Sequence, residues 1–141
     1  MDGPEESQRF EVLQPEGWPR PSGYANGIAA TGRLIFVAGQ VGWNPETCQF
    51  ETDDFVAQTT QALRNVVAVL RAAGAEPRHV VRLTWFITDK AAYLAAQREI
   101  GIAYLEVMGR HYPAMSVVVV AGLVEGQAKV ELEATAVVAA P

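Results

Sequence analysis

The chain is poor in sulfur and imidazole, with one cysteine and two histidines among its 141 residues. A single cysteine forms no internal disulfide and is typical of a reducing compartment. Cys48 lies in a Pro-Glu-Thr-Cys-Gln stretch without a basic neighbour that would activate it, so we interpret it as an incidental loop thiol. Neither HExxH nor CxxC occurs, and we predict no metal site.

Long hydrophobic runs and a surplus of positive charge are also missing. No stretch approaches 18 apolar residues, and residues 1–9 hold three acids and no apolar run, which predicts a cytoplasmic protein without a secretory signal. Eleven Lys and Arg against sixteen Asp and Glu leave a net charge of −5. Because nucleic acids and anionic membranes attract clustered positive charge, we expect neither as the main partner.

The motifs of common enzyme classes are absent as well. There is no GxxxxGK[ST] or GxGxxG loop for phosphates and no GxSxG turn for a serine nucleophile. Half of the residues are apolar and 19% are charged, which is typical of one soluble globular domain. A chain of this length buries about two thirds of its unfolded surface without a disulfide or a metal.

The N-terminal part differs from the rest in composition. Residues 1–23 carry four of the eight prolines and little periodicity. We therefore predict a mostly irregular arm over residues 1–20 and a single domain over residues 21–141. The pattern of residues 28–38 predicts two short strands about a tight turn at Thr31 and Gly32.

Two amphipathic helices and three further strands are predicted. Asp53 and Asp54 begin a helix that ends at Gly74, and its apolar face is expected to be Val56, Thr60, Leu63, Val67 and Leu70. Asp89 caps a second helix that runs to Gly109, with Tyr93, Ala96, Ile100, Ala103 or Tyr104, and Val107 at helical spacing. The three strands are Val80–Ile87, Ser116–Val120 and Lys129–Val137. Ser116–Val120 is continuously apolar and is expected to be covered on both faces, whereas Lys129–Val137 alternates apolar and polar residues.

The resulting order is β-β-α-β-α-β-β, an α+β domain with two helices on one face of a mixed sheet. The other face then has apolar positions that this chain does not cover. Large exposed apolar surfaces are uncommon on monomers, so we expect a closed cyclic homo-oligomer.

Two acids are the most notable polar residues of the last strand. Glu131 and Glu133 are two residues apart, so they share the face opposite Val130, Leu132 and Ala134. This pattern is typical of a solvated sheet face, and it also fits a carboxylate that activates water in a partly buried cleft.

Six segments in order give a specific resemblance to the RidA (YjgF-type) family. The blocks are Pro21–Gly27, Phe36–Gln40, Val56–Gly74, Val81–Asp89, His111–Ser116 and Val130–Ala136. The resemblance runs from about residue 20 to residue 138. It implies a chorismate-mutase-like fold assembled as a homotrimer, with a small-molecule cleft at each subunit interface.

Family members of the best-understood type hydrolyse reactive enamines and imines, such as 2-aminoacrylate, to a keto acid and ammonia without a metal or organic cofactor. The resemblance places the family's water-positioning glutamate at Glu131 and puts Met115 where the family has an arginine that binds the substrate carboxylate. A thioether offers no bidentate fork to a carboxylate, so we expect weak or no activity on 2-aminoacrylate. Met115 instead favours a larger or less charged ligand. A 2-aminomuconate-like compound is the larger candidate, because it is longer and would use the extra apolar room.

Five further residues are candidates for the cleft. The resemblance gives Tyr24 the position that closes over the ligand, with a half-buried interface tyrosine as the alternative. Trp43 is a candidate flat wall, and backbone N–H groups near Met115 and Ser116 are candidate donors. Arg110 and His111 are candidate replacements for the missing arginine, or cations that complement a helix C-terminus.

The sequence is compatible with two functions. One is a cofactor-free deaminase or hydrolase of small enamines or imines. The alternative is a non-catalytic trimer that binds a metabolite or acts on other proteins in a holdase-like way. A role in nucleic-acid binding is disfavoured by the net negative charge.

Overall fold

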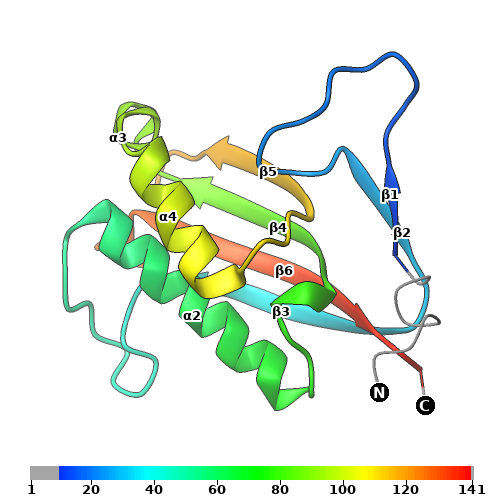
Figure 1. Cartoon of the computed structure of the whole chain (residues 1–141). Helices are drawn as coiled ribbons and strands as arrows, with labels where there is room; N and C mark the ends of the chain where they lie inside the picture. Colours follow the sequence, from blue (N-terminus) through cyan, green and yellow to red (C-terminus); the bar gives the residue numbers. More distant parts are fainter. Residues whose placement is uncertain (1–9, 141) are drawn as a thin grey trace.

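A computed structural model describes residues 10–140 and contains a four-stranded mixed sheet in the order β3-β6-β4-β5. Its strands are β3 (Arg33–Val41), β6 (Val130–Val138), β4 (Val80–Ile87) and β5 (Ala114–Val119). Strand β6 pairs antiparallel with β3 and β4, whereas β5 pairs parallel with β4 and forms one edge (Figure 1). The predicted α+β class is confirmed, and β4 has the predicted bounds.

The N-terminal segment contains a short strand within the predicted, mostly irregular arm. Strand β1 (Phe10–Leu13) pairs antiparallel with β2 (Gly27–Ala30) in a separate two-stranded sheet. The loop between them, residues 14–26, is held by Gln14, whose side-chain amide donates to the carbonyls of Trp18 and Pro19. A four-residue strand that pairs across such a loop gives too short a pattern to be detected in the sequence. Residues 1–9 of the predicted arm lie outside the described residues.

The two strands predicted over residues 28–38 are present as β2 and β3 on either side of Thr31 and Gly32, but they do not pair with each other. Strand β2 pairs with β1, while β3 pairs with β6 at the other end of the chain. Gly32, which joins β2 and β3, has a φ of +145° and lies against strand β6. A Cβ at this position would be 2.1 Å from the Val138 carbonyl oxygen, so the close approach requires glycine.

Helix α2 (Phe55–Ala72) begins and ends near the predicted residues. The Asp54 carboxylate accepts the Ala57 N–H at 2.8 Å, as an N-cap does, and Gly74 has a φ of +75° just beyond the end. Asp53 is exposed. Leu63, Val67 and Leu70 are buried as predicted, but Val56 and Thr60 lie at the margin, and the buried face also includes Gln58, Thr59, Ala62, Asn65 and Val66.

The second predicted helix is two helices in the structure. Asp89 caps α3 (Lys90–Ala95) by accepting a first-turn N–H at 3.0 Å, and α4 (Gln97–Met108) follows after Ala96. Ala96 has a φ of −109° and a ψ of 14°, which breaks the helical path without a proline or glycine to mark it. The break lets α4 bury its own face against α2. Gly109 ends α4 with a φ of +73°, as predicted.

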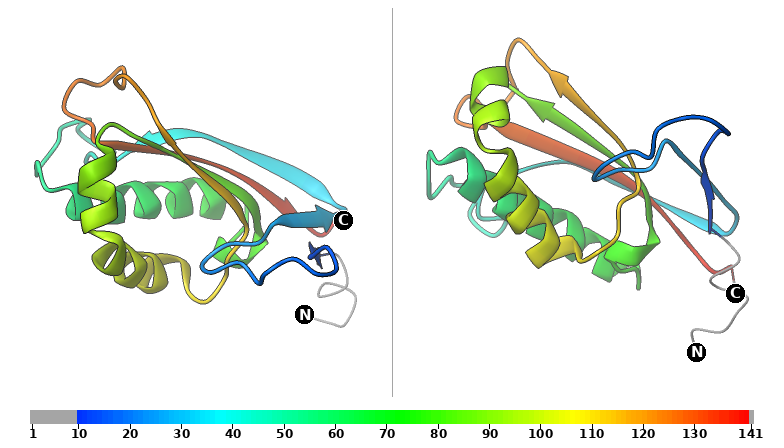
Figure 2. Two further views of the ribbon diagram at one scale, coloured as in Figure 1. Left: turned by 90° about the horizontal axis from the view of Figure 1, so that it is seen from above. Right: turned by 45° about the horizontal axis from the view of Figure 1, so that its top comes forward.

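The core lies between the sheet and the helices. Helices α2 and α4 lie on the same side of the sheet, as Figure 2 shows from above, and a single 3-10 turn, η1 (Pro77–His79), leads from α2 into β4. The largest fully buried apolar side chains are Leu63, Leu70, Leu83, Ile87 and Leu132. None of the helices in residues 10–140 has the length and apolar character needed to cross a bilayer.

Strand β5 and the far face of the sheet remain exposed. Val117, Val118 and Val119 are 40–50% exposed, so the expectation that this strand is covered on both faces is wrong for the single chain. The continuous apolar sequence belongs to β5, which lies at the edge of the four-stranded sheet and pairs with β4 in that sheet. On the face away from the helices, Leu34 and Phe36 are 56% and 73% exposed. The apolar surface that the sequence predicts is therefore present.

Candidate functional site

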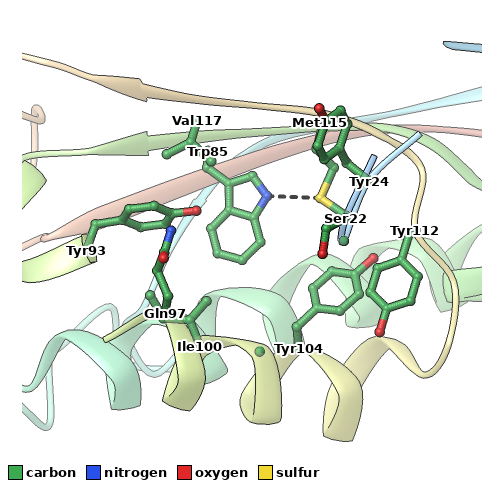
Figure 3. Close-up of a pocket in the computed structure, with 12 residues that line it drawn as sticks. Ser22, Tyr24, Trp85, Tyr93, Gln97, Ile100, Tyr104, Tyr112, Met115 and Val117 are labelled. Atoms are coloured by element: carbon green, nitrogen blue, oxygen red, sulfur yellow. Dashed lines mark hydrogen bonds between the residues drawn. The ribbon is translucent and has the colours of Figure 1, made fainter. Parts of the chain in front are cut away.

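A cleft of about 620 Å³ lies on the helix side of the sheet, between β4, β5, α4 and the segment before β2. Aromatic side chains dominate its walls (Figure 3): Tyr24, Trp85, Tyr93, Tyr104 and Tyr112. Met115 and Val117 line it from β5, and Ser22 and Gln97 contribute polar atoms. The cleft therefore has the volume and the mostly apolar character of a small-molecule site.

Trp85 lies at the centre of the cleft and is held in place by Met115. Its indole N–H donates to the Met115 sulfur at 3.4 Å (Figure 3). The indole also packs on Tyr104, with ring centroids 6.3 Å apart. Because Leu83 and Met115 are register partners in parallel strands, the Met115 side chain faces the helices. Met115 thus forms part of a fixed apolar floor.

Two stacked tyrosines form one wall. The Tyr104 and Tyr112 rings lie 5.5 Å apart with an interplanar angle of 18°. The Tyr104 hydroxyl donates to the His111 carbonyl oxygen. Burial, with a smaller contribution from Tyr112, raises the pKa of the Tyr104 hydroxyl above its usual value. The hydroxyl therefore stays protonated and keeps the ring in position.

The sequence-predicted site residues are only partly brought together. Tyr24 and Met115 line the cleft, as expected. Ser116 is exposed on the opposite face of β5, and Arg110 is exposed outside the cleft. The His111 side chain is hydrogen-bonded to the backbone, since its Nε2 donates to the Val80 carbonyl oxygen at 2.6 Å. Neither Arg110 nor His111 replaces the missing arginine within this chain.

Glu131 lies on the other side of the sheet from the cleft. Val130 and Leu132 are buried under the helices, so the intervening Glu131 side chain points to the open face and is half-buried. Trp43 is near this end of the sheet, packs on Phe50 at 5.8 Å and does not line the cleft. The expected pair of Glu131 and Met115 therefore does not meet within one chain.

Comparison with known proteins decides the family. The model of the endoribonuclease L-PSP family matches residues 19–138. The conserved Rid protein YyfB of Yersinia pestis has a TM-score of 0.80 and 34% identity, covering 92% of this chain and 99% of that one. The chain is a RidA-type member of the endoribonuclease L-PSP family.

Two further Rid relatives are informative about activity and ligands. Reactive Intermediate Deaminase A from the chloroplast of Arabidopsis thaliana is 33% identical over 131 residues, which are 92% of this chain and 67% of that protein. The E. coli protein TdcF, solved with bound serine, has a TM-score of 0.64 and 30% identity, with 90% and 98% coverage. Membership of the Rid family supports a general deaminase-like role.

The described lining of this RidA-type cleft is uncharged. None of the described residues that line it is acidic or basic. Among residues 10–140 there is also no group of three or more His, Cys, Asp or Glu that would hold a metal ion. Its polar groups are hydroxyls and one amide, which can bind and orient a ligand but cannot neutralise an anion.

The sequence pattern placed two of the aromatic lining residues, Tyr93 and Tyr104, on the apolar face of a helix. Tyr93, Gln97, Ile100 and Tyr104 follow one another at spacings of four and three, a pattern that also describes a core-facing helix surface. A cleft wall differs from a core-facing surface here because these residues lie opposite Trp85 of β4 across an open space. This arrangement exists only in the folded chain.

Proposed function

We propose that this RidA-type protein is a cofactor-free deaminase that hydrolyses small reactive enamines or imines to a carbonyl compound and ammonia. The substrates are 2-aminoacrylate-like or, because Met115 replaces the family arginine, larger and 2-aminomuconate-like. The observation that carries the proposal is that Tyr24 and Met115, at the two family positions for substrate contact, line one cleft. The name of the Arabidopsis relative and the serine bound to TdcF support a site for small amino-acid-derived compounds.

The proposed site is completed by a second copy of the chain in a homotrimer. Glu131 and the cleft lie on opposite faces of one sheet, so a carboxylate reaches the ligand only from a neighbouring subunit. Exposed β5 and the apolar far face, with Phe36 73% exposed, supply the surface for this contact. Trp43 lies two residues beyond Val41, the register partner of Glu131, and would approach the cleft from the same neighbour.

Each proposed role follows from the chemistry of the group. The Glu131 carboxylate accepts a proton from water and directs its oxygen at the C=N carbon. Backbone N–H groups near Met115 and Ser116 polarise the ligand, and Tyr24, 43% exposed at the rim, closes over it. Since no charged residue lines the described cleft, Arg110 and His111 take no part in this mechanism.

The test is ammonia release from enzymatically generated 2-aminoacrylate and from 2-aminomuconate, with wild type and Met115→Arg in parallel. We expect slow turnover of 2-aminoacrylate by the wild type, because the carboxylate lacks its charged partner. Restoring the arginine should improve binding of 2-aminoacrylate by about 2 to 5 kcal/mol, the magnitude of a buried charge pair. Faster release of ammonia by Met115→Arg at low substrate concentration would show that the cleft is the substrate site.

Met115→Leu is the matched control, because it removes the sulfur without adding charge. It should leave 2-aminoacrylate turnover near the wild-type rate. Equal rates in wild type, Met115→Arg and Met115→Leu would place the substrate elsewhere. No ammonia from any enamine or imine, with the trimer intact in sedimentation, would favour the second candidate function. That function is a non-catalytic metabolite-binding or holdase-like trimer, and the replacement of the arginine by Met115 is the observation that favours it.

Gly39 provides a prediction about the proposed carboxylate. A Cβ at Gly39 would lie 2.7 Å from the Glu131 carboxyl carbon, so Gly39→Ala must displace the Glu131 side chain. The displaced group is the end of a side chain, so we expect a stability change of at most about 1 kcal/mol. Misplacing the carboxylate by an ångström should slow ammonia release by about 10- to 100-fold. Initial rates and thermal melts of Gly39→Ala and of Gly122→Ala, where nothing lies within 4 Å, check this prediction.

A further inference from the structure

The described residues that one chain contributes to the cleft include none that would pair with an anionic ligand. Its twelve described lining residues carry no formal charge, and the polar ones offer hydroxyl groups and the Gln97 amide. A carboxylate taken from water into such a cleft loses its hydration and gains no counter-ion. The site therefore discriminates against ligands that are held through a carboxylate, and favours neutral ones.

The shape and chemistry of the walls fit an aromatic ring. The Trp85 indole lies between Tyr93 on one side and the Tyr104 and Tyr112 rings on the other, as Figure 3 shows. Aromatic rings pack well in offset or tilted arrangements at centroid separations like the 5.5 and 6.3 Å already present here. The volume of about 620 Å³ also exceeds what a three-carbon enamine fills.

The rim of the cleft determines the orientation of the ligand. Tyr24, Tyr112 and Val117 are each about 40% exposed, whereas Trp85 is 4% exposed at the floor. An apolar ring enters toward Trp85, where more of its surface is removed from water. Its polar C=N group then stays at the mouth, on the side where a neighbouring Glu131 is proposed.

We propose that the cleft selects neutral imines that carry an aromatic ring and lack a carboxylate. This inference rests on the proposed deaminase function: it keeps the hydrolysis of a C=N bond and replaces the carboxylate substrates named there with neutral ones. In the reaction, the water oxygen bonds to the imine carbon, the C–N bond breaks, and the two water protons end on nitrogen, so that an aryl imine and water give an aryl aldehyde and ammonia. The class of reaction that supplies such a substrate is the oxidation of a primary arylalkylamine.

The kinetic test compares four imines generated in situ by amine and amino-acid oxidases. 2-Phenylethylamine and 3-methylbutylamine give neutral imines with and without a ring, and phenylalanine and leucine give the corresponding carboxylates. We expect the imine of 2-phenylethylamine to have a kcat/KM at least about tenfold above each of the other three. Equal values, or a preference for the carboxylates, would overturn the inference, although hydrolysis of any of the four would preserve the proposed function.

A cleft variant tests the role of the aromatic wall. Tyr112→Leu removes one of the stacked rings, and Tyr112 is 41% exposed, so the variant is expected to fold. It should lower the rate with the phenylethylamine imine by about tenfold and lower the rate with the methylbutylamine imine clearly less. Val124→Ala, at a fully exposed position outside the cleft, should change neither rate. An equal loss with both imines in Tyr112→Leu would contradict a role in ring selection.

A binding measurement separates the inference from the catalytic proposal. Phenylacetamide and phenylacetate have nearly the same shape and differ in charge. Titration calorimetry on the wild-type protein should give a dissociation constant at least about tenfold lower for phenylacetamide. If no imine is hydrolysed but phenylacetamide binds more tightly, the selectivity stands and the deaminase proposal fails. Tighter or equal binding of phenylacetate, or no binding of either compound, overturns the inference itself.

Discussion

Replacing Glu131 by glutamine should lower the rate of ammonia release by about 10²- to 10⁴-fold, the usual contribution of a general base. Glutamine has nearly the same volume and cannot accept the proton from water at neutral pH. The Glu131 side chain is half-buried on the open face of the sheet, and none of the described hydrogen bonds ties it to the fold. The variant should therefore keep its melting temperature and its oligomeric state.

Glu133→Gln is the matched control for this result. Glu133 is two residues further along β6, on the same face, and is exposed. Its replacement should leave the rate within about twofold of wild type, because a solvated acid away from the reacting atoms contributes little. The assignment of Glu131 would be wrong if both variants lost activity equally, or if Glu131→Gln lost its trimer together with its activity. Substrate-saturation curves and sedimentation of both variants distinguish these outcomes.

Gly42→Ala should strongly destabilise the protein. A Cβ at Gly42 would lie 2.2 Å from the backbone carbonyl oxygen of Gln58, and helix α2 cannot shift without disturbing the core. Overpacking against backbone of this kind should cost about 3 kcal/mol or more. For a domain of this size, we expect the melting temperature to fall by about 10 °C.

The damage from Gly42→Ala should extend to strand β6. The Gln58 side chain is fully buried, its amide donates to the carbonyls of Thr52 and Gln127, and its oxygen accepts the Lys129 N–H at 2.8 Å. Displacing Gln58 therefore loosens the residues that lead into Glu131. Hydrogen exchange should show faster exchange at Lys129 in Gly42→Ala than in wild type.

Gly101→Ala should stabilise the protein, in contrast to Gly42→Ala. Gly101 lies inside helix α4, and a Cβ there meets nothing within 4 Å. Alanine should raise the free energy of unfolding by about 0.5 to 1 kcal/mol, because glycine loses more backbone entropy on folding. Urea denaturation of the two variants measures both changes in the free energy of unfolding. A Gly42→Ala variant as stable as wild type would contradict the close approach of the Gly42 backbone to helix α2.

Features that depend on neighbouring residues could be predicted from the sequence alone. Asp54 and Asp89 are the N-caps of their helices, Gly74 follows the end of α2, and β4 runs from Val80 to Ile87 as its composition indicates. The alternation of β6 also placed Glu131 on the face opposite its apolar neighbours. These signals are local because a cap or a strand face is determined by atoms within a few residues.

Features that depend on distant partners were missed or wrong. Strand β1 forms because β2 pairs with it across the loop of residues 14–26, and β3 pairs with β6, about one hundred residues away, and not with its neighbour β2. The break at Ala96 has no local signal, since alanine favours helix and the interruption lets α4 pack on α2. The apolar run of β5 indicated burial, whereas its place at the edge of the sheet leaves it exposed.

The candidate site shows the same division. The sequence by itself determined the family resemblance, the missing arginine at Met115 and the face of Glu131. Only the tertiary structure decided that Met115 faces the helices, that four further aromatic residues join it, and that Glu131 lies on the other side of the sheet. The physical reason is that strand pairing sets which face each side chain takes, and β5 takes its register from β4, whose residues are about thirty positions earlier in the chain.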